Sequence, residues 1–177
     1  QIEILFGPVA SCEDLLPIYD SRFEEKQDDL TYLKRAAKMM DKKECTDSEV
    51  FFKFSNRLYE LEPSADAAYN LAKMSLVKSE YTKAIGYFNE AIELAETDED
   101  KAKYLFGLAS AESKLKRYSS AKAHALEAAS LKPNWGDPYL LIGYMYAEDA
   151  GKCGSNDFER KAVYWAAIDK FRKAKAV

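Results

Sequence analysis

Three cysteines and a single histidine are the side chains with the most chemical potential in this sequence. Cys153 lies close to two glycines in the segment "AEDAGKCGSNDFERKAVYW" (147–165), and His124 is the one histidine. A catalytic Cys–His pair needs hydrogen-bond reach and a third group that orients the base. Nothing in the sequence supplies that arrangement. We therefore predict a solvent-facing histidine and an incidental thiol.

Metal and nucleotide sites are not expected either. Cys12, Cys45, Cys153 and His124 lack the spacing of zinc ligands, and the chain has neither G-x-x-x-x-G-K-[ST] nor G-x-G-x-x-G. Carboxylates are numerous, but they fall on solvated helix faces or at helix starts, where they complement the helix dipole. We predict no catalytic residue, no metal, no cofactor and no enzyme activity.

Composition narrows the class of protein. The chain has 177 residues, of which 47% are hydrophobic and 32% charged, as in soluble globular proteins. A net charge of −4 argues against general nucleic-acid binding. No apolar run reaches the roughly 18 residues of a membrane span, so we expect no membrane insertion. Few glycines and prolines, with abundant Ala, Lys, Glu and Leu, favour helices.

Helical periodicity appears in almost every segment. In "DLTYLKRAAKMM" and "VFFKFSNRLYEL" the apolar residues recur every three or four positions. The two stripes are formed by Leu30, Leu33, Ala37 and Met40, and by Phe51, Phe54, Leu58 and Leu61. Thr46 and Glu49 form a T-x-x-E capping box ahead of the second helix. We predict an all-α fold.

The helices also resemble one another. The segments "YTKAIGYFNEAIEL" (81–94), "YSSAKAHALEAASL" (118–131) and "YWAAIDKFRKAKAV" (164–177) each place a Tyr three residues before an Ala and a second Ala seven residues later. Small residues at this spacing let two helices approach closely. We expect Phe88 and Phe171 to fill the gaps between them.

This pattern resembles the tetratricopeptide repeat (TPR). The order is aromatic-x-x-Leu-Gly-x-x-Tyr, then Ala-x-x-x-Phe-x-x-Ala, then Pro, and Pro63 and Pro133 stand where the closing proline of that family belongs. The resemblance covers roughly residues 28–177. It implies a TPR-type superhelical stack of antiparallel helix pairs, or α-solenoid.

The resemblance also divides the chain, with 1–177 as a single TPR repeat domain. It predicts a half repeat at 11–26 and repeats at 28–63, 64–98, 101–134 and 136–177, the last with a lengthened hairpin at 147–163. Since neither end carries a polar capping helix, we expect a fragment of a longer array. A dimer formed through residues 1–20 or 160–177 would then be an artefact of the cut ends.

The lengthened hairpin is predicted to be a short turn followed by an early helix start. Asn156 with Glu159 makes a plausible cap, and Phe158 and Trp165 fall on one helical stripe. The second helix should therefore begin about two turns early, with Phe158 and Trp165 packed against the preceding first helix. Cys153 would lie at an exposed turn.

Cys12 and Cys45 both lie at or just before the start of second helices. Equivalent points on stacked helices are about 8–10 Å apart, beyond the Cα separation that a disulfide tolerates. This geometry favours free thiols, although an offset between the helices would allow a bond. Mass spectrometry with and without reductant distinguishes the two.

In a TPR stack the first helix of each unit lines a concave groove, which is the expected binding surface. The predicted groove residues are Lys34, Arg35, Lys38, Tyr69, Asn70, Lys73, Lys103, Phe106, Ser110, Leu140 and Tyr144. Lysines and aromatic rings in an acidic protein point to a protein or peptide partner, and the lysines favour an acidic one. The plainer interpretation is a set of solvated lysines on a solvated face.

Some TPR proteins hold a partner's C-terminal carboxylate in a clamp of Lys and Asn residues. Lys34, Asn70 and Lys103 coincide with three clamp positions. Lys38 stands where an Asn would be, and Gly107 where the last basic residue would be. Our hypothesis is that Lys34, Asn70, Lys103 and the neighbouring Lys73 contribute to partner binding.

The leading functional hypothesis is a non-enzymatic protein–protein interaction scaffold. The alternative is a structural or spacer array within a larger cell-envelope assembly. A more distant one is a carbohydrate- or peptidoglycan-associated helical protein, which would need catalytic carboxylates in a cleft. The style of the repeats is similar to that of bacterial cell-envelope proteins, so we lean towards an exported, periplasmic bacterial protein, with the cytoplasm as the alternative.

Overall fold

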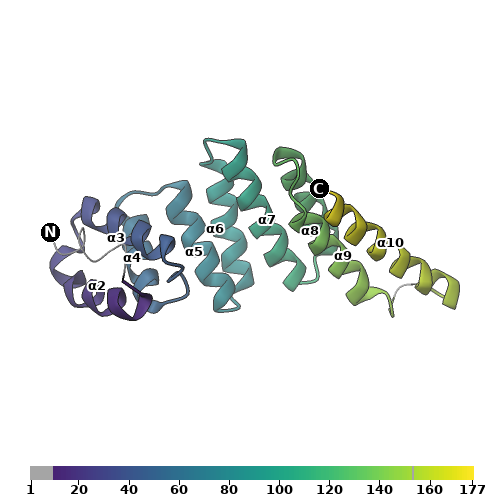
Figure 1. Cartoon of the computed structure of the whole chain (residues 1–177), viewed down its shortest axis with the longest axis horizontal. Helices are drawn as coiled ribbons and strands as arrows, with labels where there is room; N and C mark the ends of the chain where they lie inside the picture. Colours follow the sequence, from purple (N-terminus) through teal and green to yellow (C-terminus); the bar gives the residue numbers. More distant parts are fainter. Residues whose placement is uncertain (1–9, 153) are drawn as a thin grey trace.

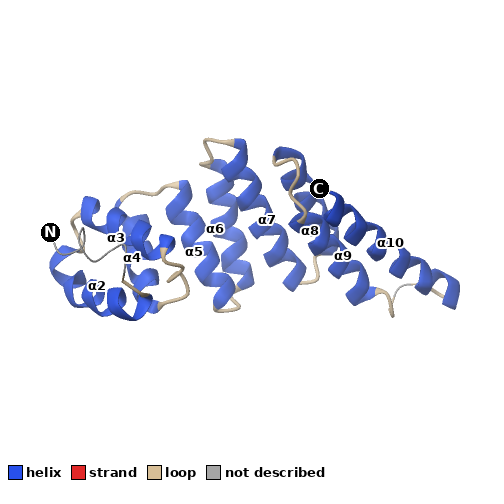
Figure 2. Cartoon of the chain, in the orientation of Figure 1, coloured by secondary structure: helices blue, strands red, loops and turns tan. Residues whose placement is uncertain are grey.

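The computed structural model describes residues 10–152 and 154–177, so the prediction for Cys153 lies outside the described residues. Within these ranges all regular structure is helical, which confirms the all-α prediction (Figure 2). The helices are α2 (Cys12–Lys26), α3 (Leu30–Lys42), α4 (Glu49–Leu61), α5 (Ala65–Val77), α6 (Tyr81–Glu93), α7 (Asp98–Lys114), α8 (Tyr118–Leu131), α9 (Asp137–Asp149) and α10 (Asp157–Ala176). They follow one another along the long axis, from α2 at one end to α10 at the other (Figure 1).

Three helix pairs, α3–α4, α5–α6 and α7–α8, are joined by the same tight turn. One residue in each turn adopts the left-handed conformation with φ of 59°, and the next N–H donates to a carbonyl five residues back. The left-handed residues are Glu44, Ser79 and Lys116. This turn repeats at nearly constant spacing, so the chain folds as successive copies of one helical hairpin. The boundaries assigned to the repeats stay a prediction, and α7 already begins at Asp98, ahead of residue 101.

Side-chain caps begin several helices. Asp29, Ser64 and Thr97 each accept a hydrogen bond from the backbone N–H three residues later. The cap predicted at Thr46 is wrong: Ser48 caps α4 by accepting from the N–H of Phe51. Thr46 belongs to the turn before the helix, because the left-handed turn delays the helix start.

The core at the N-terminal end is built from large aromatic rings. Tyr19 and Phe23 of α2 meet Tyr32 of α3 and Phe54 of α4, with ring centroids 5.0–6.3 Å apart. All four side chains are buried. Three of these four contacts are edge-to-face, an arrangement that stabilises beyond simple burial. This aromatic cluster fastens α2 to the first complete hairpin.

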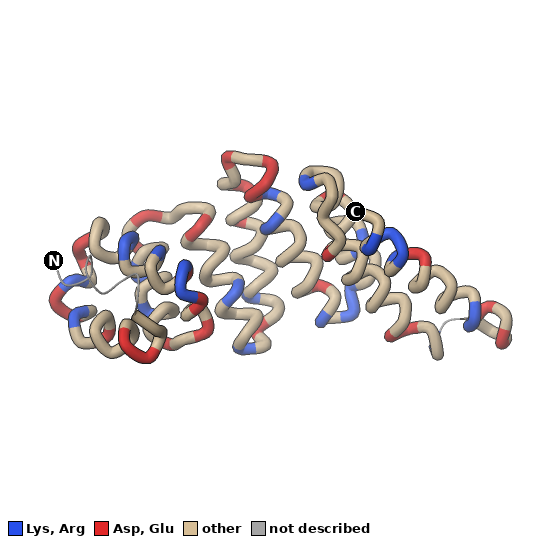
Figure 3. Tube along the Cα trace, in the orientation of Figure 1, with Lys and Arg blue, Asp and Glu red and all other residues tan. Residues whose placement is uncertain are grey.

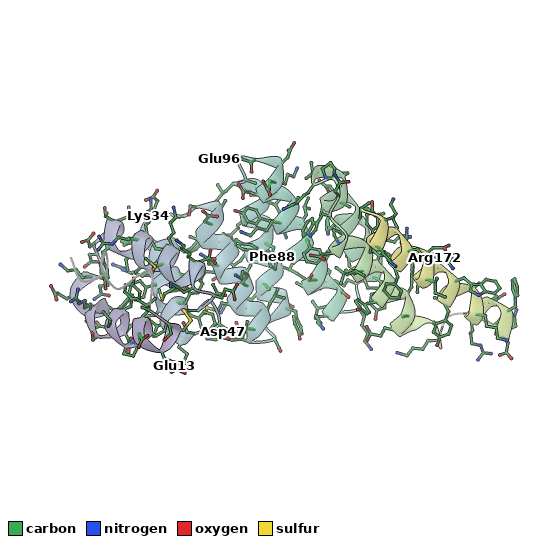
Figure 4. All side chains as sticks on the ribbon, in the orientation of Figure 1. Glu13, Lys34, Asp47, Phe88, Glu96 and Arg172 are labelled. Atoms are coloured by element: carbon green, nitrogen blue, oxygen red, sulfur yellow. A yellow bond between two sulfur atoms is a disulfide. The ribbon has the colours of Figure 1, made fainter. Side chains whose placement is uncertain are left out.

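The rest of the stack is packed mainly through alanine, with single rings set against glycine. A Cβ on Gly107 of α7 would lie 2.3 Å from the ring of Phe88, and one on Gly143 of α9 would lie 2.4 Å from the ring of Phe171. The prediction that Phe88 and Phe171 fill gaps between helices is therefore confirmed; Figure 4 labels Phe88 in the middle of the stack.

The N-terminal end is also cross-linked. Cys12 and Cys45 form a disulfide with their Cα atoms 5.6 Å apart, so the expectation of free thiols was wrong. The estimate placed both cysteines at equivalent points on stacked helices. Cys45 instead lies in the turn between α3 and α4, which brings it to the first residue of α2.

In the lengthened hairpin, α10 begins at Asp157, so the early helix start is confirmed. Asn156 accepts from the N–H of Glu159 at 2.9 Å, which confirms the cap. The packing prediction was wrong, because Phe158 is 68% and Trp165 is 56% exposed. Residues 154–161 are all exposed, so the first turns of α10 are not covered by another described helix. The two rings instead contact each other, with their centroids 6.0 Å apart.

Candidate binding face on the first helices

The predicted groove residues all lie on the first helices of the hairpins, α3, α5, α7 and α9. We call this surface the first-helix face. Basic and acidic residues both occur along the whole stack, and acidic residues lie on the helices as well as in the connections (Figure 3). Whether a partner occupies the face depends on how these side chains are already engaged.

Four residues of α5 and α7 meet at the centre of the face, and we call them the Tyr69 cluster. The ring of Tyr69 lies 4.9 Å from that of Tyr104. The ammonium nitrogen of Lys103 lies 4.2 Å from the centroid of the Tyr69 ring, and that of Lys73 lies 5.6 Å from it. Both distances suit cation–π attraction. Two positive charges from neighbouring helices therefore share one half-buried ring.

The electrostatics of the cluster follow from its burial. Burial lowers the pKa of Lys73, and the positive charge of Lys103 lowers it further, while Asp41 acts in the opposite sense. Burial, with a smaller contribution from Asp41, raises the pKa of Tyr69 to about 12. Burial and Asp66 raise the pKa of Tyr104, whose hydroxyl donates to the Asp66 carboxylate at 3.1 Å. A further negative charge near the two lysines would relieve their repulsion.

Lys73 already has weak partners from the preceding hairpin. Its ammonium nitrogen lies 3.5 Å from the Thr46 hydroxyl oxygen and 3.9 Å from a carboxylate oxygen of Asp41. Both distances are at the outer limit of a direct interaction. A carboxylate from a partner could therefore replace Asp41 at little cost.

The three predicted residues on α3 are engaged elsewhere or open to solvent. Lys34, labelled in Figure 4, forms an ion pair of 2.7 Å with Glu62 at the end of α4. The guanidinium of Arg35 lies 6.0 Å from the centroid of the Tyr32 ring, and Lys38 is exposed. These three residues belong to α3, whereas the Tyr69 cluster belongs to α5 and α7, so we treat the α3 residues as a second basic region of the same face.

The far end of the face is aromatic. Phe106 of α7 packs edge-to-face on Trp135, with centroids 4.9 Å apart. Tyr144 of α9 is 63% and Leu140 37% exposed. The hydroxyl of Ser110 donates to the Phe106 carbonyl at 2.8 Å, so it is engaged within its own helix. This end of the face can therefore make mainly apolar contacts with a partner.

The carboxylate-clamp positions are only partly brought together. Asn70 is half-buried on α5, one residue from Tyr69. Gly107, where the clamp would need a basic side chain, lies under the Phe88 ring and has no room for one. Lys34 is paired with Glu62. The basic centre of the face is therefore Lys73 with Lys103, and not the complete clamp.

Sequence reasoning missed Tyr104, Trp135 and Asp41 as parts of this face. Tyr104 directly follows Lys103, and adjacent helix residues point in different directions. Only Lys103 was therefore assigned to the face. Trp135 lies in the connection between α8 and α9, outside the helices considered. Asp41 ends α3. A search for aromatic and acidic residues at helix ends would have found the last two.

His124 was predicted to face solvent, and 31% of its side chain is exposed, but it is also engaged with a neighbouring helix. Its Nδ1 lies 2.8 Å from a carboxylate oxygen of Glu112, whose side chain is buried between α7 and α8. This pair joins the two helices of one hairpin. Among the residues that the structure describes, no group of three or more His, Cys, Asp or Glu side chains could hold a metal ion. Nor does any described helix combine the length and apolar character needed to cross a membrane.

Comparisons with known proteins show the fold. No family model matches the chain, and no curated protein matches its sequence. Two solved structures of MamA, a TPR-containing protein, are similar to it. One is 18% identical with a TM-score of 0.66, covering 94% of this chain and 92% of that one; the other is 20% identical with a TM-score of 0.68, covering 92% and 80%. At this identity the likeness concerns the fold alone, and that fold is the TPR-type helical repeat.

Proposed function

We propose that the chain is a non-enzymatic scaffold that binds an acidic segment of a protein partner across its first-helix face. The observation that carries the proposal is the Tyr69 cluster, in which Lys73 and Lys103 share one tyrosine ring. Two repelling ammonium groups, one of them half-buried, gain from a carboxylate placed between them. The fold similarity to MamA supports a scaffold role without naming a partner.

The arrangement of the face supports a segment with two parts. An acidic stretch would lie over Lys73 and Lys103, and an apolar or aromatic residue would contact Phe106 and Trp135. Rigid aromatic side chains supply most of the binding energy in many interfaces. The charged half would set orientation and the rate of association.

Binding of a fluorescent oligo-glutamate peptide tests the proposal, with oligo-glutamine of equal length as the matched probe. We expect the acidic peptide to bind more tightly and its affinity to fall with salt. Lys73→Gln with Lys103→Gln should weaken binding by about tenfold or more, since interactions with charged groups contribute roughly 1.5–3 kcal/mol each.

Lys122→Gln is the control, because Lys122 also lies over a tyrosine ring, 5.3 Å from the centroid of Tyr146, but on α8. It should leave peptide binding unchanged. Equal affinity of the two peptides, or equal effects of the double variant and the Lys122 control, would contradict the proposal.

The alternative function, a structural or spacer array within a larger cell-envelope assembly, is favoured by the intrachain pairing of two face lysines. Lys34 is held by Glu62 and Lys73 is approached by Asp41. If Asp41 already satisfies Lys73, the wild type should bind oligo-glutamate no better than oligo-glutamine, and only Asp41→Asn should distinguish the two peptides. Preferential binding of oligo-glutamate by the wild type supports the scaffold.

The disulfide supports an exported, periplasmic location over the cytoplasm. Cys45 is buried and bonded to Cys12, and disulfides of this kind form and persist in oxidising compartments. Thiol alkylation of the protein taken from its host should therefore modify neither residue until a reductant is added.

A further inference from the structure

The outward side of α10 carries a stripe of five exposed side chains that the first-helix face does not use. Its members are Phe158, Lys161, Trp165, Asp169 and Arg172. They occur at intervals of three, four, four and three residues, which places them within about 80° of the helix circumference. Figure 4 labels Arg172 on this helix. We call these residues the α10 stripe.

The expectation that a dimer through residues 160–177 would be an artefact concerns the stacking surface of the last helix, and the repeat shows that the α10 stripe lies elsewhere on that helix. Trp165 corresponds to Ser119 of α8 and Thr82 of α6, by the spacing of the helix-opening alanines, and both are exposed. The stacking positions are different ones: Tyr118 and Lys122 of α8 line a pocket against α9. Trp165 therefore occupies a position that faces outwards in every second helix of this series.

The α10 stripe is unlike its counterparts in composition. The corresponding residues are Thr82, Gly86 and Asn89 on α6, and Ser119, Ala123 and Leu126 on α8. On α10 they are Trp165, Asp169 and Arg172, and Phe158 stacks on Trp165 from the added turns. An exposed Trp–Phe pair flanked by charges has the composition of an interface centre.

The order of residues in the stripe is symmetric about Trp165. Lys161 and Asp169 lie four residues before and after it, and Phe158 and Arg172 lie seven before and after it. A two-fold axis through Trp165 would pack α10 against a second α10 in antiparallel orientation, pairing residues at equal distances on either side. Lys161 would then meet Asp169, Phe158 would meet Arg172, and Trp165 would meet its own copy.

We propose that the α10 stripe is a self-complementary interface through which two copies of this chain form a two-fold symmetric dimer. Each half contributes the charge that the other half lacks, so the ion pair and the Arg–Phe contact occur twice. Arg172 and Asp169 are 3.6 Å apart within one chain, and both side chains are more than 70% exposed. Such an exposed pair exchanges partners readily.

Charge reversal tests the register directly. Wild-type protein should show a reversible monomer–dimer equilibrium in sedimentation measured over a concentration series. Lys161→Asp and Asp169→Lys should each raise the dimer dissociation constant by about tenfold or more, because the symmetry turns two attractive pairs into two repulsive ones. The double variant Lys161→Asp with Asp169→Lys should restore the wild-type constant.

Controls separate this interface from unspecific adhesion and from misfolding. Lys175→Asp makes the same charge change on α10 outside the stripe and should leave the equilibrium unchanged. Circular dichroism should show all variants equally helical, since every altered side chain is exposed. Trp165→Ala should abolish dimerisation.

Three results would overturn the proposal. They are a wild-type monomer at every concentration, association that ignores both charge reversals, and growth beyond a dimer. Insensitivity to charge would indicate adhesion of apolar side chains, and growth beyond a dimer would exclude a closed two-fold contact. The peptide-binding test concerns α5 and α7, so each proposal can fail without the other.

Discussion

Helices α2 to α4 are packed through large aromatic rings, whereas α7 to α10 are packed through alanine, glycine and single rings. In the first region Tyr19, Phe23, Tyr32 and Phe54 form one continuous cluster. In the second, the fully buried positions of α8 are Ala121, Ala125 and Ala128. The same type of hairpin is thus stabilised by large buried rings in the N-terminal region and by close approach of helix backbones in the C-terminal region.

This difference predicts different weaknesses. An aromatic cluster buries much apolar area, but α2 reaches it as a single helix without a hairpin partner in the described residues. The disulfide compensates by tying α2 to the next turn. The alanine-lined contacts between α7 and α10 have no such cross-link among the described residues. They leave no room for added atoms, because protein interiors are packed as densely as organic crystals.

Removal of the disulfide should have the largest effect and should strike the N-terminal region. Cys12 and Cys45 are separated by 33 residues. Closing a loop of that length restricts the unfolded chain and is worth about 3–4 kcal/mol. Cys12→Ala with Cys45→Ala should lower the free energy of unfolding by this amount in chemical denaturation, and reductant should do the same to the wild type.

The part of the chain that is destabilised when the disulfide is removed distinguishes the two regions. Both tryptophans, Trp135 and Trp165, lie in the C-terminal half. Amide exchange in α2–α4 should accelerate, while tryptophan emission changes little until the whole stack unfolds. Uniform acceleration along the chain would show that the regions are not separately stabilised. Cys153→Ser is the matched control and should retain full stability.

The helices and their order could be predicted from sequence, because apolar periodicity is local and repeats from unit to unit. Phe88 and Phe171 could be assigned to packing for the same reason. The disulfide could not, because it depends on the left-handed turn at Glu44, which delivers Cys45 to α2. The estimate from periodicity assumed regularly stacked helices, and it therefore overestimated the distance between Cys12 and Cys45.

For the candidate site, the sequence likewise predicted which helices carry the residues, but not which side chains contact each other. Spacing put Tyr69, Lys73 and Lys103 on first helices, but their convergence on one ring depends on how α5 packs against α7. Periodicity also put Phe158 and Trp165 on a common stripe. It could not show that these two rings contact each other and remain exposed, because that depends on how α10 lies against α9.

A single methyl group should test the close-packed end, with an intermediate effect. Gly143→Ala would place a Cβ 2.4 Å from the Phe171 ring, which must then move. We expect a loss of about 1–3 kcal/mol from overpacking, partly offset by the better helix propensity of alanine. Thermal or chemical denaturation measures it.

Gly86→Ala is the matched control for that change, because a Cβ at Gly86 meets nothing within 4 Å. The same substitution on an exposed helix surface should stabilise the protein by about 0.5–1 kcal/mol. Opposite signs for the two variants would confirm that packing and not propensity decides at Gly143. If both stabilise, the joint between α9 and α10 is looser than the structure shows.

The smallest effect should come from the junction between the two regions, where Tyr69 has its pKa raised to about 12 by burial and then by Asp41. An unfolded tyrosine loses its proton near pH 10. Between about pH 10 and 12 the folded state therefore binds more protons than the unfolded state, and stability falls as pH rises. By about pH 12 the loss attributable to Tyr69 should reach roughly 1–2 kcal/mol.

Comparison of the wild type with Tyr69→Phe isolates this term from the titration of lysines, which both proteins share. The wild type should lose stability more steeply than the variant above about pH 10. Asp41→Asn should make the decline less steep but not abolish it, because burial is the larger cause of the raised pKa. Parallel curves for the wild type and Tyr69→Phe would mean that the Tyr69 hydroxyl is solvated, and that the basic centre between α5 and α7 is more open than either end of the stack.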